Sequence, residues 1–215
     1  MKRSNLVSAL GPFAAGLFLV YAVCGQVADL PGRSLDHPPR NEFDVIAGGT
    51  VSSKRVIGRG IDGSGLGIAG VRYSRRLFAN RYAAFRYFAD VQPLTIVSFP
   101  DTTPGTSRGK RRRVPAISLS VPGGLRTSLL PGRRFQPFLD LSTGLAYFTR
   151  RIPDERGTRF NYTASVAAGV ELQLKRGRTV AFGYRFNHIS NGGRGTFNPG
   201  FNTHDIFVGY RLKTW

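Results

Sequence analysis

The sequence predicts an all-β fold, an eight-stranded antiparallel outer-membrane β-barrel. Three observations predict it: apolar and polar residues alternate in repeated stretches, no helical periodicity follows the N-terminal region, and long connections alternate with short ones. Alternation with a period of two places successive side chains on opposite faces of a strand. Outer-membrane barrels combine such strands with short turns at one end and longer external loops at the other.

The chain begins with a segment typical of a secretory signal peptide. Lys2 and Arg3 precede an apolar run that ends in small residues, which predicts a signal peptide over residues 1–25. A transmembrane anchor is the alternative, but no basic stop-transfer flank follows. A lipoprotein signal at Cys24 lacks the small residue needed directly before the Cys. Residues 26–41 are expected to form an extended segment and residues 42–215 the barrel.

Each strand is expected where period-2 alternation appears between turn-forming residues. The clearest stretch runs from Asn161 to Leu174, with Tyr, Ala, Val and Leu on one face and Asn, Thr, Ser, Gly and Glu on the other. In chain order the expected strands are Phe43–Val51, Gly65–Ser74, Tyr82–Phe99, Val114–Leu129, Pro137–Tyr147, Asn161–Leu174, Arg178–Ser190 and Thr203–Thr214.

The connections between these strands alternate in length. The long ones are expected at Ser52–Ser64, Pro100–Arg113, Arg150–Arg159 and Asn191–Asn202, and the short ones at Arg75–Arg81, Leu130–Phe135 and Lys175–Arg178. With an even number of strands, both termini of the chain lie on the periplasmic side and all four long connections lie outside. A soluble β-sandwich or lipocalin-like barrel is the alternative. Its polar face should carry more charge than the mixture of Ser, Thr, Gly, Asn and Ala found here.

A few charged residues share the inner face of the expected barrel. Because the interior of an eight-stranded barrel is filled by side chains, buried charges there must be paired. We therefore predict an internal ion-pair network. Its members are Arg86, Asp90, Asp140, Glu171, Arg185 and Arg211.

The chain is strongly basic, with 31 Lys and Arg against 12 Asp and Glu and a formal charge of +19. Such a balance favours an anionic partner, which for a secreted chain is anionic lipid or lipopolysaccharide phosphate. Nucleic acid is excluded as the partner because no helix-turn-helix pattern, zinc-ligand spacing or RNA-binding signature is present. Both a monomer and a homodimer are compatible with the sequence.

A His and a Ser lie two residues apart on the apolar face of the seventh strand. His188 and Ser190 share that face with Phe182 and Phe186, and in a membrane barrel the face meets lipid. The eighth strand brings Asn202 and His204 beside them. A neighbouring His activates a Ser when a third group orients the imidazole, as Asn202 can. The following loop supplies oxyanion donors: Asn191, Asn198 and the Gly192-Gly193 backbone.

The block from His188 to Gly193, followed by Asn198-Pro-Gly200-Phe-Asn202, resembles the signature of the lipid A 3-O-deacylases (PagL) and related acyloxyacyl hydrolases. Segments Gln136–Gly144 and Gly157–Tyr162 extend the resemblance over the last 80 residues or so. It implies an eight-stranded barrel that removes an ester-linked acyl chain from lipid A. It implies Ser190 as nucleophile, His188 as base, and Asn198 and Gly193 as oxyanion donors.

One position departs from the family pattern. Asn202 stands where the family has an acidic triad member, so the resemblance implies a Ser-His-Asn triad that is slower than an acidic one. Asn accepts a hydrogen bond from the His ring but does not balance an imidazolium charge. Asp205 has the parity of the inner face and is not expected to replace it. His204 is a second candidate, with a structural role at the rim favoured.

A run of basic residues lies in the second long connection: Arg108, Lys110, Arg111, Arg112 and Arg113. Clustered Arg binds phosphate in a bidentate manner, so we expect these residues to contact lipid A or core phosphates, a solvated loop being the alternative. No metal or cofactor is called for, because no carboxylate joins the His residues on the outer face. The function expected is that of an outer-membrane serine esterase acting on lipid A. The alternatives are a catalytically silent structural or adhesion barrel and a lipid-binding or transport barrel.

Overall fold

A computed structural model describes residues 40–53, 61–103, 105, 110–174, 178–194 and 196–214. The expected signal peptide over residues 1–25 and all but the last two residues of the expected extended segment over 26–41 lie outside the described residues. In the described part of the chain no helix is long and apolar enough to cross a membrane.

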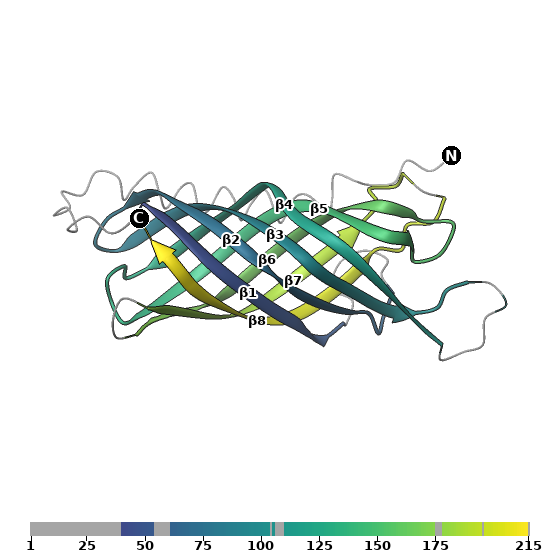
Figure 1. The fold of residues 1–215 in the computed structure, drawn as a ribbon, viewed down its shortest axis with the longest axis horizontal. Coiled ribbons are helices and arrows are strands. Elements are labelled where there is room, and N and C mark those ends of the chain that lie inside the picture. The colour runs from purple at the N-terminus through teal and green to yellow at the C-terminus, as the bar shows by residue number, and fades with distance from the viewer. Residues whose placement is uncertain are drawn as a thin grey trace. The chain divides into compact units, whose positions relative to one another are not determined.

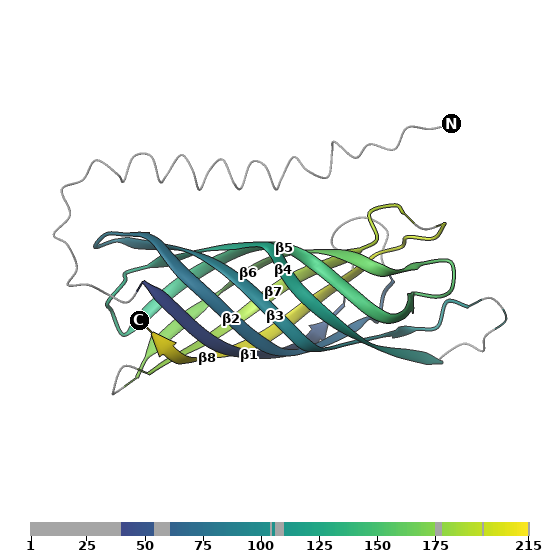
Figure 2. The ribbon, with the colours of Figure 1, turned by 45° about the horizontal axis from the view of Figure 1, so that its top comes forward.

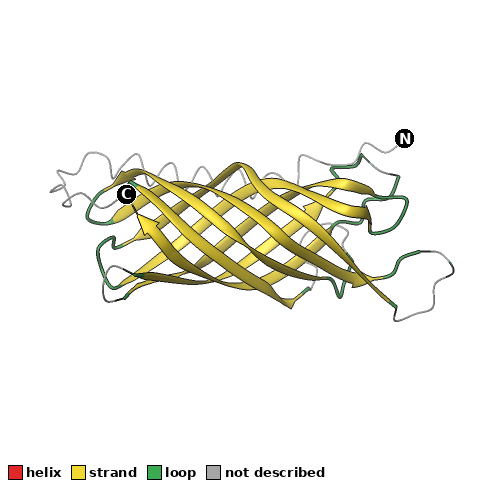
Figure 3. Cartoon of the chain, in the orientation of Figure 1, coloured by secondary structure: helices red, strands yellow, loops and turns green. Residues whose placement is uncertain are grey.

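Eight antiparallel strands form one closed barrel in which each strand pairs with its neighbours in the sequence and β1 pairs with β8 (Figure 1). Strands make up most of the described chain (Figure 3). The predicted fold class is therefore confirmed. The strands are β1 Asn41–Ser52, β2 Gly65–Ala79, β3 Ala83–Pro100, β4 Arg111–Leu129, β5 Phe135–Ile152, β6 Thr158–Gln173, β7 Thr179–Ser190 and β8 Phe201–Thr214.

Several strands are longer than the alternation of the sequence predicts. β4 begins at Arg111 rather than at Val114, and β5 continues to Ile152, so the connection to β6 is only residues 153–157. The prediction of a long connection over Arg150–Arg159 was therefore wrong. Backbone pairing explains the difference, because a ladder such as Pro100↔Arg111 needs no apolar side chains.

The two ends of the barrel differ. The start of β1 and the end of β8 lie at one end, where Glu42 pairs with Thr214 and where short turns join β2 to β3 and β4 to β5 (Figure 2). The opposite end carries the connections from β1 to β2, β3 to β4, β5 to β6 and β7 to β8. We call it the outer end, because the longer loops of membrane barrels are external.

The outer wall of the barrel is apolar. Large side chains that point away from the interior are exposed on every strand, among them Leu94, Ile117, Tyr147, Phe182 and Ile206. Exposed apolar side chains on this scale would aggregate in water, whereas lipid accommodates them. The wall is therefore the surface that faces the bilayer.

The interior near the termini is an ion-pair network, as predicted. Glu171, 1% exposed, accepts hydrogen bonds from three guanidinium groups, those of Arg86, Arg126 and Arg211. Asp140 joins Arg126 to Arg72, which also pairs with Asp90. Of the predicted members, Arg185 forms no ion pair within the described chain and lies over the ring of Phe207. Further members of the network are Glu42, Asp44, Arg72 and Arg126.

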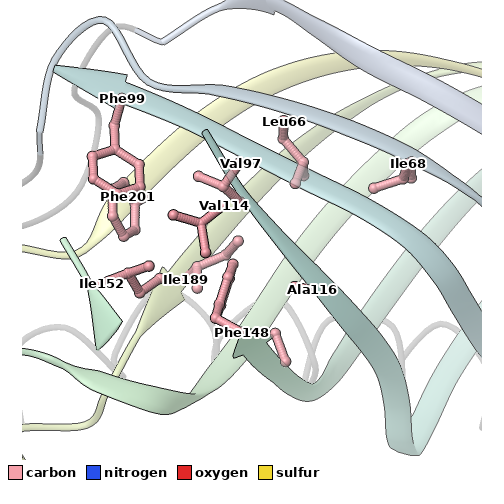
Figure 4. Packing of buried hydrophobic residues seen from close by; sticks show 11 residues of the cluster. Leu66, Ile68, Val97, Phe99, Val114, Ala116, Phe148, Ile152, Ile189 and Phe201 are labelled. Atoms are coloured by element: carbon pink, nitrogen blue, oxygen red, sulfur yellow. The ribbon is translucent and has the colours of Figure 1, made fainter. Parts of the chain in front are cut away.

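The interior near the outer end is filled instead by an apolar plug (Figure 4). The rings of Phe99 and Phe201 pack at a tilt with their centroids 5.1 Å apart, and Phe148 and Ile152 of β5 pack beside them. Ile189 also belongs to the plug and is 3% exposed. Because Ile189 lies between His188 and Ser190, the plug holds the backbone of this segment from inside the barrel.

Candidate active site

His188 and Ser190 lie on the outer face of β7, half-buried, while the intervening Ile189 points into the barrel. Strand β7 pairs with β8 so that His188 faces Asn202, and with β6 so that Ser190 faces Tyr162. The predicted parity is thus correct, and residues from three strands meet at the outer rim of the barrel. A small polar cavity in the interior is lined by Asn187 and Ile189, on the other side of the wall.

Asn202 orients the imidazole of His188. The Asn202 side chain is 2% exposed, and its Oδ1 lies 2.7 Å from Nδ1 of His188. An amide oxygen only accepts, so Nδ1 must carry the proton that it donates to Asn202. The lone pair of a neutral His188 is then on Nε2, the nitrogen available to take a proton from a hydroxyl.

Ser190 is close to this pair in sequence but is not bonded to it. Within the described part of the chain, no hydrogen bond joins Ser190 Oγ to the His188 ring. Two residues span about 6.6 Å along a strand, so contact requires the imidazole to reach along the wall toward Ser190. Hydrogen bonds between catalytic groups are often long in free enzymes and shorten when substrate binds.

The loop after Ser190 starts with a tight turn at residues 191–194. Arg194 N donates to Asn191 O, and Gly192 and Gly193 have φ values of 65° and 81°. Two successive residues with positive φ define a turn that favours glycine at both positions. The Asn191 side chain holds the turn, since its Oδ1 accepts from Gly193 N at 2.9 Å and its Nδ2 donates to Phe197 O.

The three expected oxyanion donors are differently placed. The N–H of Gly193 is already bonded to the Asn191 side chain, and the Asn191 amide is occupied within the loop. Asn198 is exposed, and its Oδ1 accepts from Asn191 N at 3.1 Å. This bond holds the Asn198 amide at the peptide group that follows Ser190. Its Nδ2 carries no hydrogen bond among the described residues.

Asp205 and His204, the neighbouring titratable residues of β8, have other hydrogen-bond partners than His188. Asp205 is buried in the barrel interior, as its parity predicts, where it accepts hydrogen bonds from Thr50 and Thr203. His204 lies on the outer face and bonds through Nδ1 to the hydroxyl of Tyr184. Its ring also packs on Phe186, with centroids 5.4 Å apart.

The predicted basic run divides into parts with different surroundings. Arg108 lies outside the described residues, and Lys110 is exposed at the end of the β3–β4 connection. Arg111, Arg112 and Arg113 were predicted to lie in a loop. They belong instead to β4, which already begins at Arg111. Arg111 donates to Gly63 O and Arg112 to Pro153 O, so both connect the outer loops to one another. Arg113 is exposed.

An ion pair that no repeated sequence pattern indicates connects three outer loops. Arg156 pairs with Asp154 at 2.7 Å, donates to Thr102 O, and lies over the ring of Phe197, the residue before Asn198. The Asp-x-Arg spacing within a turn was the only local signal for it. The pair links the β5–β6 turn to the loop that carries Asn198.

The Asp154 carboxylate should resist protonation. The hydrogen bond from Arg156 lowers the pKa of Asp154 from 3.8 to about 2. A carboxyl whose pKa is lowered by folding stabilises the fold above its ordinary pKa, and that contribution disappears as the pH falls through the folded value. We expect a carboxyl titration by NMR to give a midpoint near pH 2. A midpoint near 3.8 would show that the ion pair does not form in solution.

Taken together, a closed barrel with an apolar wall and charged interior defines an outer-membrane β-barrel protein, with polar side chains gathered at its outer rim. The family model of the lipid A 3-O-deacylases (PagL) matches residues 101–211, just over half of the chain. The chain therefore belongs to the PagL family.

The fold has a counterpart among solved structures. The crystal structure of the outer membrane enzyme PagL is similar with a TM-score of 0.55 at 15% sequence identity, over 77% of this chain and 97% of that one. At this identity the likeness shows the fold alone. Among curated proteins, none matches the chain in sequence.

Proposed function

We propose that this protein is a serine esterase of the outer membrane that removes the 3-O-linked acyl chain from lipid A. Membership of the PagL family supports deacylation of lipid A as the general activity. The serine-esterase mechanism is supported by the bond between His188 Nδ1 and Asn202 Oδ1, on the lipid-facing wall beside Ser190. It leaves Nε2 of His188 as the base on the surface where an acylated lipid would lie.

The reaction then follows from the placement of these groups. Ser190 Oγ attacks the ester carbonyl while His188 Nε2 takes its proton, and Asn198 Nδ2 donates to the developing oxyanion. The C–O bond of the ester breaks and His188 returns the proton to the leaving sugar hydroxyl. Water, activated by the same nitrogen, then releases the fatty acid from Ser190.

Lipid A mass spectrometry tests this function. Outer membranes of a host that lacks deacylase should lose one hydroxyacyl mass when they contain the wild type, and fragmentation should place the loss at the 3-O position. Ser190→Ala should leave lipid A intact, whereas Ser118→Ala, a serine inside the barrel, should act as the wild type. Identical lipid A from cells with folded wild type and folded Ser190→Ala would contradict the proposal.

A catalytically silent structural or adhesion barrel is the second candidate. It is favoured by the absence, among the described residues, of a bond between Ser190 and His188, and by the neutral residue at position 202. The two candidates differ in the mass experiment, because a silent barrel gives unmodified lipid A even when it is folded and abundant in the membrane.

Asn202 is expected to support catalysis less well than an acidic residue would at the same position. Asn202→Leu removes the acceptor for Nδ1 and should lower kcat about 100-fold, because the imidazole loses its orientation. Asn202→Asp adds a charge that stabilises the imidazolium formed during attack, and should raise kcat by up to about tenfold. Both are measured as fatty acid release in mixed micelles. An Asp variant as slow as the Leu variant would show that the site depends on a neutral partner.

A further inference from the structure

We propose that Arg194 is a specificity-determining residue that binds the phosphate of lipid A on the same glucosamine as the scissile ester. The inference rests on the proposed function of the site. It differs from the phosphate contacts expected from the basic run at Arg108–Arg113, which lies on other strands and loops.

The tight turn after Ser190 places Arg194 over β6. Arg194 N closes the turn by donating to Asn191 O, and Gly192 lies so close to the ring of Tyr162 that an added Cβ would be 2.9 Å from it. Tyr162 is in turn the register partner of Ser190. The turn therefore folds back onto the residue that flanks the proposed nucleophile.

Two aromatic rings hold the guanidinium of Arg194. Its central carbon is 4.4 Å from the ring centroid of Tyr162 and 5.1 Å from that of Phe160, and the two rings meet edge to face. A cation over an aromatic face is attracted by the charge distribution of the ring, and this contact does not use the N–H donors of the guanidinium for a hydrogen bond to an oxygen. Stacking also removes much of the side-chain freedom that an exposed Arg would otherwise lose on binding.

The donors of Arg194 are available to a ligand. Arg194 is exposed, and among the described residues no carboxylate or carbonyl accepts a hydrogen bond from its guanidinium. This contrasts with Arg111, Arg112 and Arg156, which all donate to protein oxygens nearby. An oriented, unpaired cation at the rim of a lipid-facing site is suited to a phosphate, which accepts two parallel hydrogen bonds from one Arg.

The chemistry of the substrate indicates which phosphate is bound. Ser190 must reach the 3-O ester, and the 1-phosphate is carried by the same sugar ring, whereas the 4′-phosphate is on the other sugar. Arg194 lies over the ring of Tyr162, and Tyr162 is the register partner of Ser190 on the neighbouring strand. This short separation suits a phosphate on the same sugar ring as the ester. The phosphate contact would thus position the sugar on the outer wall of the barrel so that its 3-O ester lies at Ser190.

The test compares three lipids and three proteins. Arg194→Gln should lower kcat/KM about 10- to 100-fold on bisphosphorylated lipid A and on lipid A without the 4′-phosphate, chiefly through KM. It should leave kcat/KM unchanged on lipid A without the 1-phosphate. Arg150→Gln, an equal charge change at the outer end of β5, should behave as the wild type on all three. Equal losses on every lipid, or none, would overturn the proposal.

A binding measurement separates this inference from the proposed function. In a Ser190→Ala background, bisphosphorylated lipid A should bind at least tenfold more weakly after Arg194→Gln, and lipid A without the 1-phosphate should bind equally to both proteins. If the wild type cleaves no lipid A, the proposed function fails, and this comparison still decides whether Arg194 binds the phosphate. If Arg194→Gln weakened binding to the lipid without the 1-phosphate but not to the lipid without the 4′-phosphate, the assignment would be overturned.

Discussion

Replacing His188 by Gln is expected to lower kcat/KM for lipid A at least 1,000-fold. Gln still fills the space and still bonds to Asn202, but it has no nitrogen that takes a proton from Ser190. A positioned base contributes roughly 10²–10⁴ in rate, and more where it also activates a nucleophile. Turnover of purified protein in mixed micelles measures the effect. His204→Gln is the matched control, because this residue occupies the same face of the next strand and bonds to Tyr184.

The combined effect of substitutions at Ser190 and His188 tests the same role of His188 as base. If Ser190 and His188 act as one unit, Ser190→Ala combined with His188→Gln should be no slower than either single variant. Independent contributions would multiply instead. A His188→Gln protein with more than about a tenth of wild-type activity, or a double variant slower than both singles, would remove His188 from its role as base.

Replacing Glu171 by Gln is expected to lower the free energy of unfolding by about 3–5 kcal/mol, the largest effect on stability. The carboxylate of Glu171 is 1% exposed and accepts from Arg86, Arg126 and Arg211. Its neutralisation leaves these three cations facing each other in the barrel interior with less compensating charge. The change is costly because the cations are not solvated and retain only Glu42, Asp44 and Asp140 as partners.

Urea unfolding in detergent, followed by the mobility shift between folded and unfolded barrel, measures this change. Glu155→Gln is the matched control, since Glu155 is exposed in the β5–β6 turn and its change should alter stability by less than about 0.5 kcal/mol. A Glu171→Gln barrel that unfolds at the wild-type urea concentration would show that the interior charges are balanced in another way.

Much of the fold follows from local patterns in the sequence. Each strand has one lipid-facing and one inward side, so the residues must alternate, and this alternation is visible wherever the wall is apolar. It correctly assigned Asp140 and Glu171 to the interior and His188 to the outer face. It failed at the strand ends, as at Arg111, because backbone pairing extends beyond the apolar band and leaves no mark on side-chain type.

The candidate site was only partly visible in the sequence. Parity and the shared signature placed His188, Ser190 and Asn202 together. Arg156 of the β5–β6 turn contacts Thr102 and Phe197 in two other loops, and Arg194 of the β7–β8 loop lies over Tyr162 of β6. No periodic pattern encodes such contacts, because they depend on how far each loop folds back over its neighbours.

By itself, the sequence determined that the chain alternates as eight strands, which residues face lipid, and which segment carries the His-x-Ser pair. Those properties depend on residues near one another in the chain. Only the tertiary structure decided that Asn202 bonds to Nδ1 of His188, that Gly193 N is already occupied, and that Arg194 is held over β6. The physical reason is that hydrogen bonds and ring contacts require atoms within a few ångströms, and strand register and turn geometry set those distances.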